Sequence, residues 1–181
     1  MPQQLTDSTR RGEGAASRPA GPPKRASESA TEMVQVVLPN DANPLGFILG
    51  GTVMHLIDIA GAIACHRHTR SLLVTAAVDG LQFLHPIKVG DLIILKSRVT
   101  AVWSTSLEAE VEVFSEETLT GVRRMTSRAY LTFVSIDRDG RRVAIPGLVL
   151  ETAEERQRAA EADQRRAARL EARQRLTGTD L

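Results

Sequence analysis

Hydrophobic positions in the middle of the chain change from a helical to a strand-like pattern. From residue 52 to residue 68, apolar side chains point in almost every direction of a helix. A helix that is apolar all round is one buried on all sides. Four strand-like runs then follow one another, at residues 72–83, 91–102, 106–116 and 122–137. We therefore predict one fully buried helix followed by four successive strands.

The third run shows the strand pattern most clearly. Glutamates alternate there with apolar side chains, which are Leu107, Ala109, Val111 and Val113. A period of two is typical of a sheet with one face on the core and the other in water. We also predict a short strand at residues 33–37, before the helix. Residues 138–141 have the composition of a turn. The sequence predicts an α+β fold, in which one antiparallel sheet wraps round one helix.

Two polar segments flank this domain, which we place at residues 33–150. Residues 1–32 have hardly any large apolar side chain, and we predict a disordered tail there because such a segment cannot offset its ordering entropy. Residues 151–181 are rich in Ala, Glu, Arg and Gln without a wide apolar stripe. We predict a solvated, charged C-terminal helix and tail; packing of this helix against a neighbouring subunit is the alternative.

Composition narrows the classes of protein to which the chain can belong. A formal net charge of +1 gives no electrostatic reason to expect a nucleic acid or a membrane surface as partner. No apolar run reaches the ~20 residues that span a bilayer, and the N-terminal segment lacks the apolar core of a secretory signal. The single cysteine, Cys65, excludes an internal disulfide and fits a reducing compartment. We therefore expect a cytoplasmic protein of one domain.

Asp58 is the main candidate for chemistry, because it lies in the apolar helix between Ile57 and Ile59. An ionised carboxylate loses solvation in such surroundings, which costs stability unless the group has a partner or a use. Desolvation also makes a carboxylate a stronger base, as general-base activation of water requires. A hydrogen bond to a neighbouring backbone group or to His55 is the structural alternative.

The Gly50-Gly51 pair is the second candidate, because glycines at a helix start let a ligand approach the backbone closely. Unpaired N–H groups there, with the helix dipole, can hold a carbonyl oxygen that gains negative charge during acyl transfer. Asn43, in the preceding loop, is the third candidate. The alternatives are a tight loop for the glycines and a turn position before Pro44 for Asn43.

Other familiar catalytic patterns are missing from the sequence. In the segment Cys65-His66-Arg67-His68 the spacing is wrong for two metal ligands on one helical face, and adjacent helical residues cannot form a Cys–His pair. No phosphate loop, dinucleotide fingerprint or Gly-x-Ser-x-Gly elbow is present. Any hydrolysis is therefore expected to use a carboxylate and water, with no metal and no cofactor.

Several segments occur in the order that is typical of one family. They include Asn43-Pro44-Leu45-Gly46 and Gly50-Gly51 within residues 39–51, followed by residues 55–62, 74–79, 83–91, 104–109 and 115–121. Over about residues 38–170 the chain resembles the acyl-CoA thioesterases of the brain-type acyl-CoA hydrolase group and their single-domain bacterial relatives. Phe47, Leu49 and Trp103 depart from that group's usual residues, which affects the expected acyl-chain preference and CoA contacts.

This resemblance implies the hotdog fold and hydrolysis of fatty acyl-CoA to free fatty acid and CoA. It implies that Asp58 is the helix carboxylate, that the partner subunit contributes Asn43, and that N–H groups near Gly50 and Gly51 hold the thioester oxygen. CoA is expected near four polar or basic positions: Thr105, Ser106, Arg123 and Arg124. Members of the group pair two hotdogs through their sheets, and single-domain members commonly assemble three such dimers into a hexamer.

Two other functions stay open on the sequence alone. A hotdog hydratase or dehydratase acting on hydroxyacyl thioesters needs a histidine beside a carboxylate, and His55 with Asp58 could supply that pair. A non-catalytic acyl-CoA-binding regulatory module would bind without turnover, although no helix-turn-helix or basic stripe is present to contact DNA.

Overall fold

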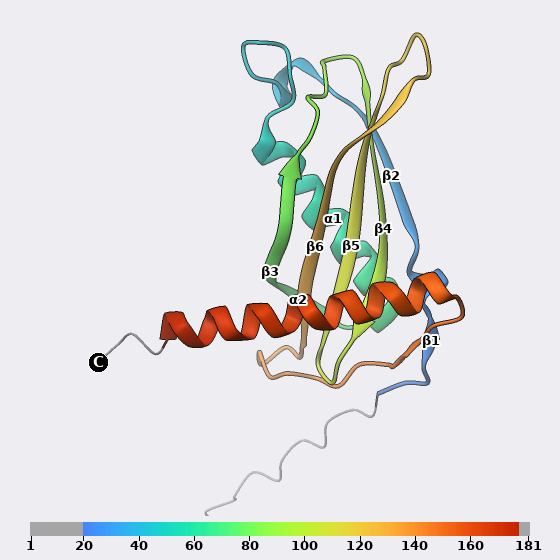
Figure 1. Ribbon diagram of the computed structural model, residues 1–181, viewed down its shortest axis with the longest axis vertical. Helices are drawn as coiled ribbons and strands as arrows, with labels where there is room; N and C mark the ends of the chain where they lie inside the picture. Colours follow the sequence, from blue (N-terminus) through green and yellow to red (C-terminus); the bar gives the residue numbers. More distant parts are fainter. Residues whose placement is uncertain (1–19, 178–181) are drawn as a thin grey trace, which may run out of the picture.

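A five-stranded antiparallel sheet, in the order β2-β4-β5-β6-β3, forms the body of the protein, whose computed structural model describes residues 20–177. The strands are β2 (Thr31–Val36), β3 (Leu72–Phe83), β4 (Leu92–Val102), β5 (Ser106–Glu116) and β6 (Arg123–Ile136). The helix α1 (Gly50–Thr69) lies against one face of the sheet (Figure 1). This arrangement confirms the predicted fold, and the four long strands begin and end within one residue of the predicted bounds.

The core lies between α1 and the inward-facing side chains of the strands. Leu107, Val111 and Phe133 are almost completely buried there. At Gly61 the helix comes so close to the sheet that an added Cβ would lie 3.2 Å from Cε2 of Phe133. The Ser97 hydroxyl on β4 also donates a hydrogen bond of 2.7 Å to the carbonyl oxygen of Ala60. One side of α1 is therefore fixed firmly against the sheet.

The other side of α1 is open to solvent in the single subunit. Met54 is 49% exposed, His55 is exposed, and Asp58 and Ile59 are only partly buried. The prediction that this helix is buried on all sides is wrong for one subunit, because the sheet covers only one side of it. An apolar pattern around a helix does not show whether each side is buried by the same chain or by a partner subunit.

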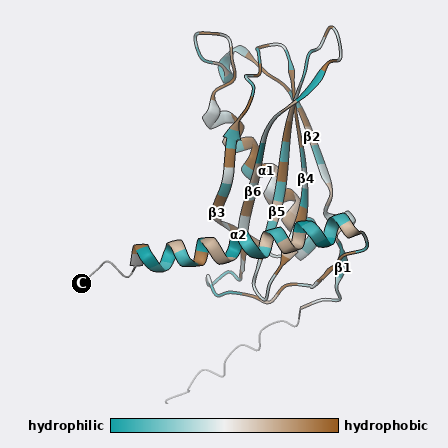
Figure 2. Cartoon of the chain, in the orientation of Figure 1, coloured by the Kyte–Doolittle hydropathy of each residue, from teal (hydrophilic) through white to brown (hydrophobic). Residues whose placement is uncertain are grey.

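The outer face of the sheet is crossed by the C-terminal helix α2 (Ala153–Thr177), so that the two helices lie on opposite faces (Figure 1). Figure 2 shows that α2 is mostly hydrophilic where it crosses the strands. Beneath it, Glu108 is completely buried and Glu110 is 3% exposed. Two predictions are therefore wrong: the glutamate face of β5 is not in water, and α2 is not a solvated extension but packs on its own subunit's sheet.

Ordered structure begins before the predicted domain boundary at residue 33. The short strand β1 (Lys24–Arg25) pairs in parallel with β7 (Leu148–Val149), and the 3-10 helix η1 (Ala26–Ser29) leads into β2. A second 3-10 helix, η2 (Pro39–Asp41), follows β2. The remainder of the predicted tail, residues 1–19, and residues 178–181 lie outside the described part of the chain. Within residues 20–177, neither helix is both long enough and apolar enough to cross a bilayer.

Candidate active site

Asp58 is held by a residue that the sequence analysis did not single out. The Thr75 hydroxyl on β3 donates a hydrogen bond of 2.7 Å to Oδ1 of Asp58. No partner is present for Oδ2 of Asp58 among residues 20–177, and both side chains are accessible to solvent. The carboxylate is thus oriented through one oxygen while the other is available to a water molecule or a ligand.

The strand β3 that carries Thr75 lies at an edge of the sheet and pairs only with β6 (Figure 1). Leu72, Val74 and Val78 on this strand are 52%, 45% and 44% exposed. An edge strand with unpaired backbone groups and exposed apolar side chains is a surface suited to a partner strand. The pair of Asp58 and Thr75 therefore lies beside a natural interface.

The first turn of α1, which contains Gly50 and Gly51, has backbone N–H groups without helical partners. The N-cap residue Leu49 makes no side-chain hydrogen bond to the helix, and the first helical bond runs from the N–H of Val53 to the carbonyl oxygen of Leu49. The N–H groups of the first turn consequently lack helical partners. Both glycines are exposed, and an added Cβ at Gly51 would meet no atom within 4 Å. An anionic oxygen could reach these donors.

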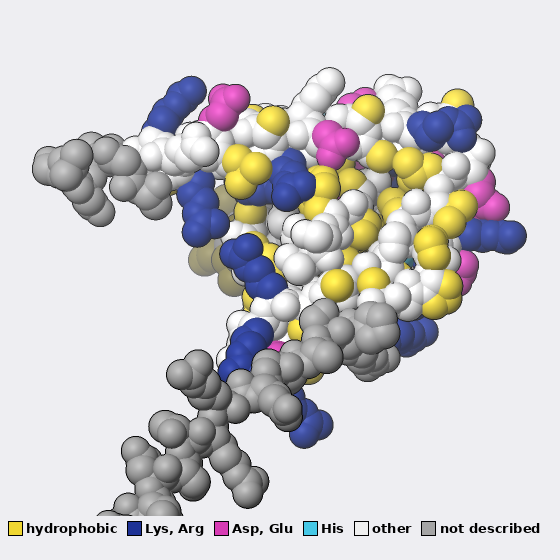
Figure 3. Space-filling model, turned by 90° about the horizontal axis from the view of Figure 1, so that it is seen from below, with side chains coloured by type: hydrophobic (Ala, Val, Ile, Leu, Met, Phe, Trp, Pro, Cys, Tyr) yellow, Lys and Arg dark blue, Asp and Glu magenta, His cyan; other side chains and the backbone are white. Residues whose placement is uncertain are grey.

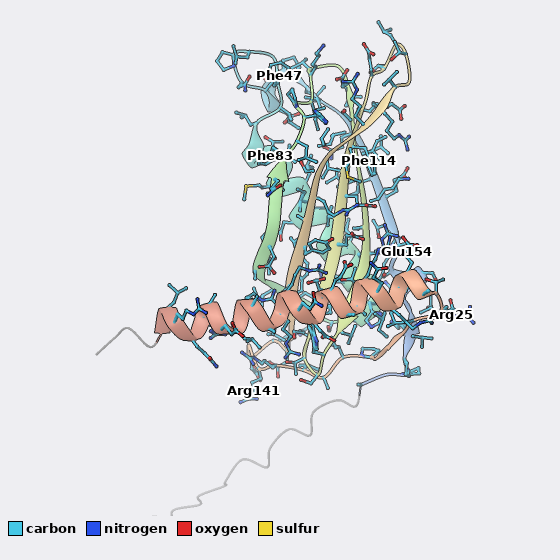
Figure 4. The ribbon with its side chains drawn as sticks, in the orientation of Figure 1. Arg25, Phe47, Phe83, Phe114, Arg141 and Glu154 are labelled. Carbon is cyan, nitrogen blue, oxygen red and sulfur yellow. The ribbon has the colours of Figure 1, made fainter. Side chains whose placement is uncertain are left out.

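A groove of about 300 Å³ runs beside this helix start. Its walls are mainly apolar and include Val53, Phe83 and Ile87, together with Gly50. Figure 4 shows Phe83 at the end of β3 next to the first turns of α1, with Phe47 above it in the preceding loop. We call this the apolar groove. Its position next to the free N–H donors makes it a candidate for the chain that is attached to a reacting carbonyl group.

Asn43 has a role of its own in the loop before α1. Its Oδ1 accepts hydrogen bonds from the N–H of Leu45 at 3.0 Å and the N–H of Phe47 at 3.3 Å, which together form an Asx turn. The side-chain amide nitrogen has no partner in the described part of the chain. No hydrogen bond within residues 20–177 joins Asn43 to Asp58.

The four predicted CoA contacts do not form one patch in a single subunit. Thr105 and Ser106 lie at the turn from β4 to β5, whereas Arg123 and Arg124 lie at the start of β6. These pairs are at opposite ends of β5, which is roughly 30 Å long at the usual rise per strand residue. Figure 3 shows both basic and acidic side chains over the lower end of the molecule.

The segment at the end of α1, residues 65–68, is structural. Burial raises the pKa of the Cys65 thiol well above its ordinary value, which disfavours the nucleophilic thiolate. His68 is buried, its Nε2 lies 2.9 Å from the carbonyl oxygen of Pro146, and burial lowers its pKa. His55, the candidate for a hydratase pair, makes no hydrogen bond to Asp58 among the described residues. The geometry thus gives no support to a His–Asp pair.

Thr75 and the apolar groove were missed by the sequence analysis. The short link at Arg70–Ser71 makes β3 run back along α1, so a residue soon after the turn can lie opposite the helix. That topology limits the candidates to a few positions on β3. The choice among them depends on the angle between helix and strand, which the sequence pattern does not give.

Comparisons with known proteins agree on one family. The family model of the Thioesterase superfamily matches residues 45–122. The acyl-CoA thioester hydrolase YkhA of Bacillus subtilis is 39% identical over 71% of this chain and 74% of its own length. The human cytosolic acyl coenzyme A thioester hydrolase is 33% identical over 75% of this chain. The chain spans only 36% of the length of that human relative.

Solved structures agree with these sequence relatives. An acyl-CoA hydrolase from Staphylococcus aureus in complex with butyryl coenzyme A and coenzyme A has a TM-score of 0.78 and 31% identity, covering 88% of this chain and 100% of that one. A hexameric acyl-CoA thioesterase has a TM-score of 0.80 and 34% identity, covering 83% and 97%. With the helix-wrapped sheet described above, these matches show that the chain belongs to the thioesterase superfamily, in its group of acyl-CoA thioester hydrolases.

Proposed function

We propose that this protein hydrolyses fatty acyl-CoA to free fatty acid and CoA, with Asp58 as the base that activates water. The observation that carries the proposal is the hydrogen bond from Thr75 to Oδ1 of Asp58, which leaves Oδ2 accessible in a fold shared with acyl-CoA hydrolases. A fixed carboxylate with one open oxygen is suited to general-base chemistry on a bound water molecule.

Relatives support the choice of residues. Structures of the Staphylococcus aureus acyl-CoA hydrolase include variants in which an asparagine, an aspartate and a threonine are each replaced by alanine. The asparagine precedes that aspartate by 15 residues and the threonine follows it by 17. Asn43, Asp58 and Thr75 have the same separations in this chain. We therefore include Thr75 with Asn43 and Asp58 in the proposed site.

In the proposed reaction, the oxygen of water attacks the thioester carbonyl carbon while Oδ2 of Asp58 accepts a proton. Negative charge develops on the carbonyl oxygen, and the N–H groups of Gly50 and Gly51 stabilise it. The carbon–sulfur bond then breaks, and the proton is returned to the sulfur as the CoA thiol leaves. Water is the second substrate, so this route requires no cofactor beyond the CoA carried by the substrate.

The proposed site needs two subunits. Gly50 and Asp58 are eight residues apart on one helix, which corresponds to roughly 12 Å of helical rise. The oxyanion donors must lie within hydrogen-bond distance of the carbonyl oxygen, and the base must reach the same carbonyl carbon through one bound water molecule. We infer that Asn43, Gly50 and Gly51 of one subunit face Asp58 and Thr75 of another, across the exposed edge of β3. A hexamer made of three such dimers is supported by hexameric relatives.

A thiol-release assay with acyl-CoAs of increasing chain length tests this function. Asp58→Asn keeps the size of the side chain but removes the base, and we expect kcat to fall about 10²–10⁴-fold. Asp139→Asn, in the exposed turn that follows β6, is the matched control and should keep wild-type rates. Equal rates in wild type and Asp58→Asn would remove Asp58 from the mechanism, and no thiol release from any acyl-CoA would refute the function.

The cytoplasm is the compartment that we propose for this activity. The single cysteine is buried and unpaired, as is common in a reducing environment.

A further inference from the structure

A second groove adjoins the apolar groove at His85 and Pro86, which line both. It has a volume of about 200 Å³ and lies between the loop that precedes β4 and the loop that joins β5 to β6. Polar and charged side chains line most of it, including Lys88, Ser115 and Arg124. We call it the polar groove. An apolar channel that continues directly into a polar one fits a ligand with an apolar arm and a charged end.

Two cations in the polar groove have no partner in the described part of the chain. The side chains of Lys88 and Arg124 make no hydrogen bond or ion pair within residues 20–177, and both residues are exposed. Arg123, next to Arg124, is different, because its Nε and Nη2 donate to Oε2 of Glu116 at 3.0 and 2.6 Å. Most arginines on the sheet are similarly paired, so Lys88 and Arg124 stand out as available cations.

Each of the two carboxylates in the polar groove has one oxygen that accepts a hydrogen bond from its own loop. Oδ2 of Asp91 accepts a hydrogen bond of 3.3 Å from the backbone N–H of Lys88. Oε2 of Glu117 accepts one of 2.6 Å from the Thr120 hydroxyl. These contacts satisfy one oxygen of each acid locally, whereas the side chains of the two cations keep all their donors for a ligand. An anion is therefore the ligand that the unused groups fit, and phosphate accepts charge-assisted hydrogen bonds from both lysine and arginine.

We propose that Lys88 and Arg124 bind the phosphate groups of CoA, and that the apolar groove takes the arm that leads to the thioester. The proposal rests on the acyl-CoA hydrolase function above and identifies where its substrate is held. It retains Arg124 from the four positions expected on the sequence and assigns no phosphate contact to Arg123, which Glu116 already holds. Thr105 and Ser106 are at the other end of β5, away from this groove.

Comparison of two substrates separates phosphate binding from catalysis. Acyl-CoA and the matching acyl-pantetheine share the thioester and the arm, but only acyl-CoA has phosphates. We expect Lys88→Gln and Arg124→Gln each to raise KM for acyl-CoA about tenfold, equivalent to ~1.4 kcal/mol, with kcat little changed. Neither substitution should change kinetics with acyl-pantetheine. Arg141→Gln, at the opposite end of the molecule (Figure 4), is the control for loss of one positive charge.

Three results would overturn the assignment: equal KM increases for both substrates, no increase with acyl-CoA, or a larger effect of Arg123→Gln than of Arg124→Gln. Calorimetric binding of CoA to the full chain gives a readout that does not depend on turnover. If no acyl-CoA is hydrolysed but CoA binding is weakened by Lys88→Gln and Arg124→Gln, the hydrolase function fails and the phosphate site stands. Undiminished CoA binding in both variants refutes the site even if hydrolysis is confirmed.

Discussion

The hydroxyl of Thr75 determines how the proposed base is presented. A carboxylate on a helix can rotate about its side-chain bonds, and each rotation moves the oxygen that must meet water. The hydrogen bond from Thr75 to Oδ1 of Asp58 restricts that rotation without occupying Oδ2. Hydrogen bonds to charged groups contribute about 1.5–3 kcal/mol, so a loss at this position should be measurable in the rate.

We predict that Thr75→Val lowers kcat about 10–100-fold, because valine has nearly the same shape but cannot donate to Asp58. Thr75→Ser keeps the hydroxyl and should recover most of the rate. KM should change less than kcat, since Thr75 acts through the carboxylate. Steady-state kinetics of the three proteins measure this. If Thr75→Ser is as slow as Thr75→Val, packing by the Thr75 methyl group, and not the hydrogen bond, is what matters.

Among single residues, the sequence analysis identified the one that does not fit the apolar pattern of its helix. Asp58 was found because a carboxylate between Ile57 and Ile59 is unexpected in an apolar helix. Thr75 was missed because threonine is common in strands, and only the packing of β3 against α1 places it opposite Asp58. The same packing leaves Asp58 only partly buried within one subunit.

Among the elements, α2 is attached to the sheet by arginines on one of its faces. Arg158 reaches Glu110 at 3.3 Å, Arg165 binds both oxygens of Glu108, and Arg169 pairs with Asp79 on β3. Positions 158, 165 and 169 share a helical face because they are seven and four residues apart. Trp103, which departs from the family's usual residue, adds a contact of 2.9 Å from its Nε1 to Asp163 on this helix.

Breaking the pair of Arg165 and Glu108 should cost more stability than breaking an exposed pair does. Glu108 is completely buried and accepts bonds from Arg165 at 2.7 and 3.1 Å and from Thr100 at 2.8 Å. We predict that Arg165→Met lowers the free energy of unfolding by about 3 kcal/mol, because it leaves a buried carboxylate without its cation. The double variant Arg165→Met/Glu108→Met should recover much of the loss, since no buried charge is then left alone.

Urea unfolding of the single and double variants measures this difference. Arg141→Met removes an arginine whose side chain is 71% exposed and should change stability by less than about 0.5 kcal/mol. A double variant less stable than Arg165→Met alone would contradict the argument. It would mean that the Arg165–Glu108 pair stabilises α2 beyond what apolar packing can replace.

The four long strands were predicted to within one residue at each end, because alternation along a strand is a local property. What covers each face of the sheet is not local. Glu108, Glu110 and Glu112 indicated a polar face. Such a face is in contact with water only if no other element packs on it. The arginines of α2 lie about fifty residues later in the chain, and a helix without an apolar stripe gives no pattern that predicts docking. Ion pairs from Arg158, Arg165 and Arg169 position it, and Ala162 is the apolar side chain that it buries completely.

At the scale of the whole molecule, the single subunit is incomplete in two ways. Its proposed oxyanion donors and its proposed base are too far apart along α1 to act on one carbonyl. Its edge strand β3 leaves Leu72, Val74 and Val78 exposed beside that base. A symmetric dimer across β3 would cover these side chains and bring the start of one α1 towards the middle of the other. Both observations therefore point to one assembly.

Mixed dimers test whether each site uses two subunits. Asn43→Ala and Asp58→Asn should each be nearly inactive alone, but a heterodimer of the two joins the intact Asn43 of one subunit to the intact Asp58 of the other. Its second site then holds both substitutions. Random pairing in a two-fold symmetric dimer makes about half of the dimers mixed, each with one intact site, so co-refolded subunits should recover about a quarter of the wild-type rate.

If Asn43 and Asp58 instead acted within one subunit, every site in every dimer would carry one of the two substitutions. Mixing would then give only the average of the two residual rates, however long the subunits were allowed to exchange. The same refolding procedure applied to each variant alone controls for activity gained by refolding itself. Because the recovered fraction depends on how the sites are shared and not on the strength of any contact, a rate near a quarter would establish sites formed by two subunits.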